Sequence, residues 1–597
     1  MTLPNDTSYL VEGANQVPKQ EFLSTLSRVY EGHGTAIVFI EQHILSALNR
    51  LGIAARDFGR DKGVVGVFLF QNTINYVSAD NVVYILNPDL SNVRSVVVHL
   101  LSYTQRFPSA KPTILYVPQK TLIAEQVMED EFKLSQRFPT LHIASLDLDY
   151  VFLEEKVFTM ELPLSFKSVF AEGDLSNLTW IARLLLKLQT GRFGAIRHIR
   201  GKGSHAAKVV QLLQRMQNDI GNDFITDIPS EVETLIIIDR SVDFITPLMT
   251  QLTYEGLIDE LYNIENCEAQ FPFSLGESSG VGASERVLLN STDRMFAEIR
   301  DKNFAGVGSV LYQKSLWVKQ NYDKRKEVHH LKELKEFMKG LPEMQEMHRL
   351  IGIHTNVATE ISKTTQSTDF RKRILIEQNI IQQISESDTL KYIEDLVFRK
   401  EKFENVLRLL ALLSLVNGGL RERELLSLKE NMMLAYGIPH VITTFFLLER
   451  CGLLCVQSGK GSSYRSVFKQ LQTWNASVAD EQPNDTAYAY RGYAPPLVRM
   501  VDTLLRNPQA WDAEDDAVSL LPGEKKELLN DVEVAATTKA AIVFVIGGIT
   551  ASEVSALRFV EERLSSGATP HRLFIGATDL ISGNRMIRSL LPFEPSR

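Results

Sequence analysis

Residues 235–260 read LIIIDRSVDFITPLMTQLTYEGLIDE, and the change of pattern within them indicates the architecture of the chain. Residues 235–238 are four consecutive apolar residues, three of them β-branched, which is typical of a central parallel strand covered on both faces. The polar pair Asp239 and Arg240 follows, then a turn that ends at Pro247, and then an amphipathic helix. This stretch predicts a junction between a buried sheet and a helical region. A rigid α/β base that carries a helical superstructure suits protein binding better than small-molecule chemistry.

Short apolar segments alternate with helical ones in the first 150 residues. The candidate strands are residues 35–41, 64–70, 81–86, 113–118 and 141–146, and a helical segment lies between residues 86 and 113. Strands that alternate with helices are typical of a parallel, doubly wound sheet. Residues 1–150 are therefore expected to form an N-terminal α/β domain.

A second α/β region begins near residue 151, with a helix that opens at the expected N-cap Ser176 and then the strand at 235–238. Its remaining strands come only near the C-terminus, in residues 540–548 and 572–578. Helical sequence fills the gap from about residue 253 to residue 472. The simplest interpretation is an α/β domain split by a large all-α insertion.

The composition excludes several classes of function. The length of 597 residues suggests about four domains, or fewer if a domain is discontinuous. A formal net charge of −9 argues against sequence-independent binding of nucleic acid, which needs a basic surface. The same acidity disfavours electrostatic docking of the chain on anionic lipid.

Membrane association is expected to be indirect. The first 20 residues are polar, so no signal peptide is expected. The most apolar helical run, residues 406–416, contains Arg408 and Ser414 and is too short to span a bilayer. The expected location is the cytoplasm, with contact to membranes through partners.

The cysteines give no sign of a disulfide framework or a metal site. The chain has three, Cys267, Cys451 and Cys455. The last two are four residues apart, but no nearby Cys or His pair completes a zinc site. Buried thiols are the favoured interpretation, and no metal or cofactor is expected.

Three motifs invite an enzymatic interpretation, and each lacks part of what the chemistry needs. Asp239 and Asp243 follow a strand as catalytic carboxylates often do, yet no Lys or Ser/Thr constellation accompanies them. Residues 201–204, GKGS, lack the Walker-loop spacing. Residues 547–548 form a Gly pair without GxGxxG, and Thr550 with Glu553 explains the site as a helix capping box. An α/β enzyme that uses these strand ends remains an alternative, but the expected answer is no enzyme.

Residues 235–260 resemble the signature of the SM family, the Sec- and Munc-type proteins that bind SNAREs and govern membrane fusion. Residues 296–311, FAEIRDKNFAGVGSVL, together with TQLTYEGLIDE, resemble the vacuolar and endolysosomal branch, the vacuolar protein sorting 33 type. Residues 490–505, YRGYAPPLVRMVDTLL, and 544–559, FVIGGITASEVSALRF, resemble segments of the C-terminal half of SM proteins in the same order.

The resemblance implies an arch of three domains. Their expected boundaries are 1–150 for domain 1, 151–250 with 473–597 for domain 2, 251–362 for helical lobe 3a and 363–472 for helical lobe 3b. It also implies a non-enzymatic function, in which the chain aligns R-SNARE and Qa-SNARE motifs for vesicle docking and fusion at late endosomes and lysosomes or the vacuole. Asp239, Arg240 and Asp243 are then structural, with Asp239 and Arg240 satisfying backbone groups and each other.

A helical stripe between residues 331 and 361 carries the predicted SNARE-binding surface. Apolar residues recur there every three or four positions, and three of them are methionines, which adapt to varied partner helices. Periodicity alone favours a buried core helix, whereas the resemblance to the helical hairpin of lobe 3a favours SNARE binding. The candidate SNARE-binding residues are Leu334, Phe337, Met338, Leu341, Met344, Met347 and Ile351. Pro342 interrupts the stripe and is the candidate hinge of the hairpin, because proline disfavours a continuous helix by about 3 kcal/mol.

A second apolar cluster opens after Gly437. Similar vacuolar SM proteins grip a scaffold subunit of the HOPS tether in this region, the vacuolar protein sorting 16 type. The candidate scaffold-binding residues are Ile438, Val441 and Phe445. A passive scaffold that never contacts SNAREs remains an alternative. The sequence leaves open which SNAREs bind and whether domain 1 holds a pocket for an N-terminal SNARE peptide.

Overall fold

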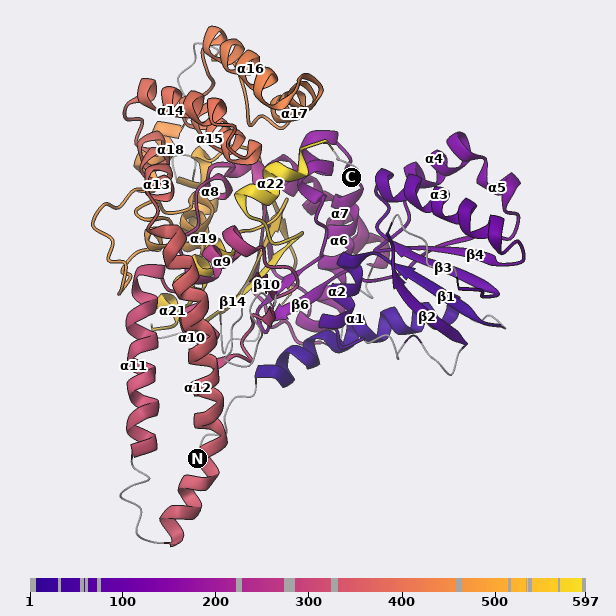
Figure 1. Cartoon of the computed structure of the whole chain (residues 1–597), viewed down its shortest axis with the longest axis horizontal. Coiled ribbons are helices and arrows are strands. Elements are labelled where there is room, and N and C mark those ends of the chain that lie inside the picture. Colours follow the sequence, from indigo (N-terminus) through magenta and orange to yellow (C-terminus); the bar gives the residue numbers. More distant parts are fainter. Residues whose placement is uncertain are drawn as a thin grey trace. The chain divides into compact units, whose positions relative to one another are not determined.

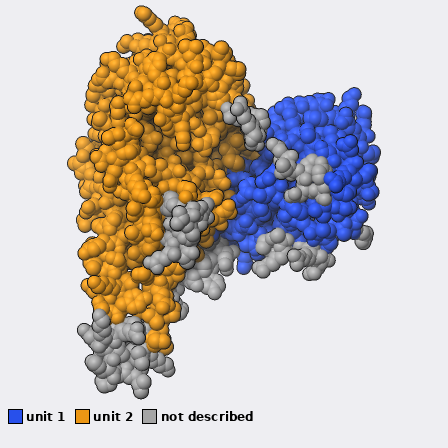
Figure 2. All heavy atoms as spheres, in the orientation of Figure 1, with its two compact units in different colours: residues 1–162 blue, residues 163–597 orange. Residues whose placement is uncertain are grey.

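The computed structural model describes residues 7–29, 34–53, 58, 63–71, 77–221, 228–272, 285–323, 331–457, 464–513, 517–532, 534, 539–566 and 570–592. The chain divides into two compact units, residues 1–162 and residues 163–597 (Figure 2).

The first unit is built on a parallel sheet with the strand order β2-β1-β3-β4-β5 (Figure 1). Its strands are β1 Ala36–Ile40, β2 Val64–Leu69, β3 Asn81–Leu86, β4 Lys111–Tyr116 and β5 His142–Ser145. Its helices are α1 Thr7–Val29, α2 Gln42–Arg50, α3 Leu90–Arg106, α4 Leu122–Phe132 and α5 Leu134–Arg137. All five predicted strands and the predicted helix between residues 86 and 113 are confirmed. The inner strand β1 is buried along its whole length, as an unbroken apolar run requires.

Helix α1 and a short hairpin complete the first unit, and neither was predicted. The hairpin pairs β6 Val151–Glu154 with β7 Val157–Thr159. The buried amide of Asn15 joins α1 to it: the Asn15 side chain donates to the carbonyl of Phe152 at 2.9 Å and accepts from its N–H at 2.8 Å.

The sheet of the second unit takes strands from both ends of that unit, in the order β12-β8-β9-β13-β14. These are β8 His198–Lys202, β9 Thr234–Asp239, β12 Lys525–Leu529, β13 Lys539–Ile546 and β14 His571–Ala577. Ile236 of β9 lies opposite Arg200 of β8 on one side and Val543 of β13 on the other. The prediction that the two C-terminal strands complete a sheet begun before residue 240 is confirmed, whereas β8 and the edge strand β12 were missed.

Helices occupy most of the segment between β9 and β12. In chain order they are α8 Ile245–Leu248, α9 Tyr254–Tyr262, α10 Arg294–Ile299, α11 Phe304–Asp323, α12 Leu331–Thr365, α13 Thr368–Ile381, α14 Glu386–Phe398, α15 Phe403–Asn417, α16 Glu422–Tyr436, α17 Ile438–Arg450, α18 Tyr464–Gln470, α19 Pro496–Arg506 and α20 Ala517–Leu520. An antiparallel pair, β10 Glu268–Phe271 and β11 Glu285–Leu288, was not predicted. The fold class, α/β with an all-α insertion, is the predicted one. The boundaries of the lobes within this unit stay predictions.

Four helices flank the sheet of the second unit in sequence: α6 Ser176–Leu188, α7 Ser204–Ile220, α21 Ala551–Ser565 and α22 Gly583–Ser589. Ser176 was predicted to be the N-cap of helix α6, but it is the first residue of that helix. Leu175 holds the N-cap position without a side-chain hydrogen bond, and the carboxylate of Asp174 accepts from the Ser176 N–H at 2.9 Å.

Helices α11 and α12 run side by side as a long hairpin (Figure 1). Helix α12 is 35 residues long and continues through Pro342, so a hinge at this proline stays a prediction. Pro342 lacks an N–H, so the carbonyl of Met338 has no donor four residues later in the helix. The two helices share an apolar core with α9 and α10, whose members include Leu257, Phe296, Val307, Leu311, Leu350, Val357 and Ile361.

Candidate functional site

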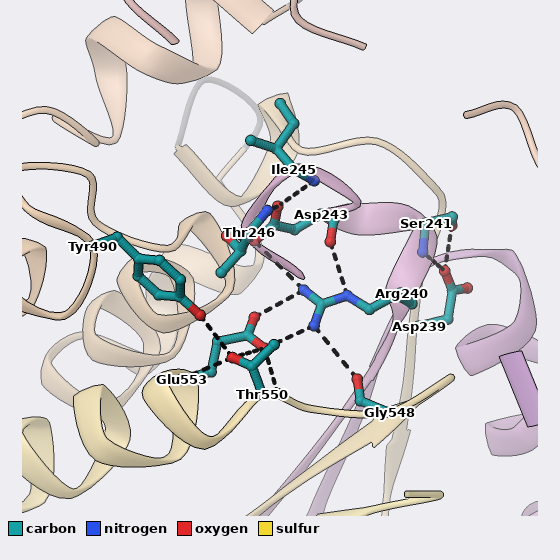
Figure 3. A network of polar contacts seen from close by, with 10 residues as sticks. All are labelled: Asp239, Arg240, Ser241, Asp243, Ile245, Thr246, Tyr490, Gly548, Thr550 and Glu553. Atoms are coloured by element: carbon teal, nitrogen blue, oxygen red, sulfur yellow. Dashed lines mark hydrogen bonds and ion pairs between the residues drawn. The ribbon is translucent and has the colours of Figure 1, made fainter. Parts of the chain in front are cut away.

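Arg240 is the centre of a buried polar network at the junction of sheet and helices (Figure 3). Its guanidinium donates two hydrogen bonds of 2.9 Å to the two carboxylate oxygens of Glu553 on α21. Its Nε donates to the carbonyl of Asp243 at 2.8 Å, and an ion pair with the Asp243 carboxylate spans 3.5 Å. Burial alone would lower the pKa of Arg240, but the charges of Glu553 and Asp243 and the hydrogen bonds to Glu553 together outweigh burial and raise that pKa. Arg240 therefore remains a cation that is fully satisfied inside the protein.

Asp239 was predicted to pair with Arg240, but it caps helix α7 instead. Its carboxylate accepts from the N–H of His205 at 2.8 Å and from that of Ser241 at 3.0 Å. Burial alone would raise the pKa of Asp239, yet the contacts with His205 and Ser241 hold it below its usual range. Gly203, the N-cap position of α7, has φ +105°, and a Cβ there would lie 2.2 Å from this carboxylate.

This capping removes the basis for a phosphate-binding interpretation of residues 201–204. The N-terminus of a helix attracts anions, and at α7 the anion is the chain's own Asp239. The predicted capping box on α21 is confirmed, because Thr550 and Glu553 exchange hydrogen bonds with each other's backbone N–H groups. Among the residues that the structure describes, no group of three or more His, Cys, Asp or Glu side chains could hold a metal ion.

A second buried arginine fixes the other end of the junction. Arg408 of α15 donates two hydrogen bonds to the carboxylate of Glu260, at 2.7 and 2.8 Å, and two of 2.6 Å to the carbonyls of Leu248 and Met249. Arg408 and Glu260 side chains are 2% and 3% exposed. Arg408, which interrupts the apolar run of α15 in the sequence, thus joins α15 to the segment that follows the sheet.

The base of the helical hairpin is held by a buried chain of three polar side chains. The Tyr254 hydroxyl on α9 lies 3.0 Å from Nδ1 of His354 on α12, and Nε2 of His354 lies 3.0 Å from the carboxylate of Asp293. Asp293 also caps α10 through the N–H of Phe296, at 2.8 Å. Burial would raise the pKa of Asp293, but the contacts with His354 and the backbone N–H groups of Phe296 and Met295 together outweigh burial and lower that pKa. This chain fixes α12 against both neighbouring helices.

Most of the described side chains of the predicted SNARE-binding stripe are turned toward neighbouring helices of the same chain. Met344 and Ile351 are each 7% exposed, and Leu341 and Met347 are half-buried. Met338 is 57% exposed, and Pro342 is exposed as well. The side chains of Leu334 and Phe337 lie outside the described residues. Periodicity identified the helix correctly, but much of the stripe is core in this conformation.

The open surface of the hairpin is a groove between α11 and α12 with a volume of about 900 Å³. Its lining is mostly small or hydroxylated: Ala305, Gly308 and Ser315 from α11, and Thr355, Ala358, Thr359 and Ser362 from α12. Ile351, a predicted residue, also lines it. A Cβ at Gly308 would meet nothing within 4 Å, so the groove is open above that glycine. This surface was not predicted, and its signal in the sequence is the recurrence of small residues at intervals of three or four.

The predicted scaffold-binding cluster on α17 divides into a buried and an exposed face. Val441 and Phe445 are completely buried in the core of the helical region, so neither side chain is accessible to a partner in this structure. Ile438 is 58% exposed, and it is followed on the same face by Ile442 at 48% and Phe446 at 56%. Leu434, four residues before Ile438 on α16, is 86% exposed. Within α17 the spacing of four places Ile438, Ile442 and Phe446 on one exposed apolar face, whereas Leu434 precedes the helix break at Gly437.

None of the helices that the structure describes is long and apolar enough to cross a membrane.

A split sheet with a long helical hairpin inserted is a fold that the chain shares with solved proteins of the SM class. The chain belongs to the Sec1 family, whose model matches residues 54–589. It is 33% identical to rat vacuolar protein sorting-associated protein 33A, over 86% of each chain. It is 31% identical to the vacuolar protein-sorting-associated protein 33 homolog of Arabidopsis thaliana, over 85% of this chain and 86% of the relative.

Solved structures share the fold at low sequence identity. The SM protein Vps45 in complex with the Qa SNARE Tlg2 matches with a TM-score of 0.54 and 17% identity, covering 96% of this chain and 97% of that one. The Unc18–syntaxin 1 complex from Monosiga brevicollis matches with a TM-score of 0.55 and 17% identity, covering 96% and 98%.

Proposed function

We propose that this chain binds SNARE motifs and templates their assembly for vesicle docking and fusion at late endosomes and lysosomes or the vacuole. The chain performs no covalent chemistry in this role. It holds an R-SNARE beside a Qa-SNARE and thereby replaces part of the entropy cost of bringing two disordered segments together.

The observation that carries the proposal is the groove between α11 and α12. Small residues such as Gly308 and Ala358 allow the backbone of a docked helix to approach closely, as in helix-in-groove recognition. Ile351 supplies an apolar contact within the groove. The buried chain at His354 keeps the base of the groove rigid, so less ordering is needed when the partner binds. The related Vps45 structure contains a Qa SNARE, which supports the choice of partner.

Calorimetry with purified lysosomal or vacuolar R-SNARE and Qa-SNARE motifs tests this proposal. Gly308→Leu places a side chain in the open groove and is expected to weaken binding at least tenfold. Gly352→Leu is the matched control, because Gly352 is also a helical glycine with nothing within 4 Å of its Cβ position but does not line the groove. Equal affinities of both variants, or no binding by the wild-type chain, would contradict the proposal.

A second contact is proposed with a scaffold subunit of the vacuolar protein sorting 16 type, within a HOPS-type tether. The supporting observation is the exposed apolar face of Ile438, Ile442 and Phe446 on α17, together with the exposed Leu434 near the end of α16. If only this contact exists, the chain is a passive scaffold, and the calorimetric experiment separates the two possibilities.

A further inference from the structure

The groove of the hairpin continues beyond the hairpin itself. At its base it meets a second hollow of about 560 Å³, and the two share Phe304, Ala305 and Thr365 in their walls. The second hollow has an apolar floor that includes Leu252, Leu257, Phe370 and Ile374. A helix that lies in the groove therefore has a continuous path onto α13.

Two arginines stand at the end of this path. Arg371 on α13 and Arg491 in the segment after residue 490 both line the second hollow, and both are exposed. Neither guanidinium forms an ion pair with any residue that the structure describes. Asp480 lines the same hollow, and the Asn303 side-chain amide lies 3.5 Å from its carboxylate. The charged lining of the hollow thus has two cations and one anion.

The backbone around Arg491 is fixed rather than free to adapt. Arg491 has φ +48°, in the left-handed region. Its carbonyl accepts a hydrogen bond of 3.1 Å from the side chain of Gln378, which lies two turns after Arg371 on the same helix. Gln378 therefore ties the segment that carries Arg491 to the helix that carries Arg371. Two unpaired guanidinium groups held at the end of an apolar path form a site that suits a carboxylate.

We infer that Arg371 and Arg491 form an acid-recognising subsite that takes an Asp or Glu side chain of the helix docked in the groove. From Phe304 to Ser315, α11 accompanies the groove for about 16 Å, or about three helical turns. The recognised carboxylate belongs about one turn beyond the apolar residues that fill this length. The subsite sets the register of the docked helix, because a shift by one turn moves the acid away from the arginines. This inference rests on the proposed function and adds the chemistry that orients the partner.

A charge reversal tests the subsite with the SNARE motif that binds the wild-type chain most tightly. Arg371→Glu combined with Arg491→Glu is expected to weaken binding about tenfold and to reduce its dependence on salt concentration. Lys372→Glu is the control, because Lys372 is the next residue on α13, does not line the hollow, and lies with its ammonium 4.6 Å from the ring of Tyr392. Each Asp or Glu of the motif is then changed singly to Lys. One of these changes is expected to weaken binding to the wild-type chain and to restore binding to the double variant.

The outcomes separate this inference from the proposed function. If the double variant binds as tightly as the wild type while Gly308→Leu does not, the groove is used but the subsite is wrong. If Lys372→Glu weakens binding as much as the double variant, the effect is general electrostatics and the subsite is again wrong. If the wild-type chain binds no SNARE motif, the proposed function and the subsite both fail.

Discussion

Arg240 and Glu553 lie 313 positions apart and form a bidentate ion pair in which neither side chain is exposed. Glu553 also closes the capping box of α21, so one carboxylate holds both the start of a helix and the turn after β9. The pair joins the N-terminal and C-terminal parts of a domain whose sequence is interrupted by the helical insertion. Both partners are needed, because Glu553 without Arg240 would be a buried anion, and Arg240 without Glu553 would keep only the longer ion pair with Asp243.

The first prediction concerns the stability of this pair. Glu553→Ala is expected to lower the free energy of unfolding by about 3–5 kcal/mol, since it removes the bidentate partner of a buried guanidinium, leaves it only the longer ion pair with Asp243, and removes a cap. Urea denaturation followed by circular dichroism measures the change. Glu346→Ala is the control, because Glu346 pairs with Arg349 on the surface of α12 with both side chains more than half exposed. Its expected cost is below about 1 kcal/mol, and equal costs for the two variants would contradict the structural role of Arg240.

Local patterns predicted much of the fold, whereas long-range pairings needed the structure. The apolar run at 235–238 and the Thr550–Glu553 spacing were sufficient to predict a strand and a capping box, because both depend on neighbouring residues. Nothing in that spacing identifies Arg240 as the partner of Glu553.

The two candidate binding surfaces show the same limit. Helix α17 has apolar residues on several sides, so its sequence could not tell that Val441 faces the core and Ile442 faces outward. The groove was missed because small residues such as Gly308 and Ala358 contribute little to a hydrophobic periodicity. The Met-rich stripe was predicted because its large apolar side chains dominate the hydrophobic periodicity. Much of that stripe proves to be buried within the protein.

The second prediction concerns pH. Burial raises the pKa of Asp259 to about 6, although the charge of Arg585 opposes this. A carboxyl whose pKa is higher in the folded than in the unfolded chain stabilises the fold when protonated. Its contribution is therefore complete below about pH 4 and is lost as the pH rises through about 6.

In the wild-type chain the Ile264 N–H donates a hydrogen bond of 3.1 Å to the Asp259 carboxylate. Asp259→Asn keeps a side-chain oxygen that can accept this hydrogen bond, but the amide cannot ionise. The difference in unfolding free energy between variant and wild type is expected to shift in favour of the variant by about 3 kcal/mol between pH 4 and pH 7. Urea denaturation at a series of pH values measures it, with the wild type as reference for all other titrating groups. A difference that stays constant with pH would show that Asp259 ionises normally in the fold.

The third prediction concerns Pro342. Replacement by Ala supplies the missing N–H for the carbonyl of Met338 and removes a cost of up to about 3 kcal/mol from the continuous form of α12. Hydrogen exchange of amides near residues 338–346 is expected to slow at least tenfold. If Pro342 is the hinge and partners select the straight hairpin, SNARE affinity rises as well.

Gly340→Ala controls for helix propensity alone, because Gly340 lies in the same turn with nothing within 4 Å of its Cβ position. Unchanged SNARE affinity together with unchanged exchange in Pro342→Ala would rule out the hinge.

The last prediction separates the two faces of α17. Ile442→Asp changes an exposed side chain, so the fold is expected to persist while binding of a vacuolar protein sorting 16-type subunit falls at least tenfold, as expected when an apolar anchor is lost. Val441→Asp buries a charge and is expected to lower the melting temperature whether or not the subunit is present. Co-purification with the subunit and thermal denaturation measure the two effects. Val98→Asp on α3 is the control, because Val98 is 59% exposed on a helix of the first unit. If Ile442→Asp and Val98→Asp bind the subunit equally well, the exposed face of α17 is not the contact, and the scaffold must hold this chain elsewhere.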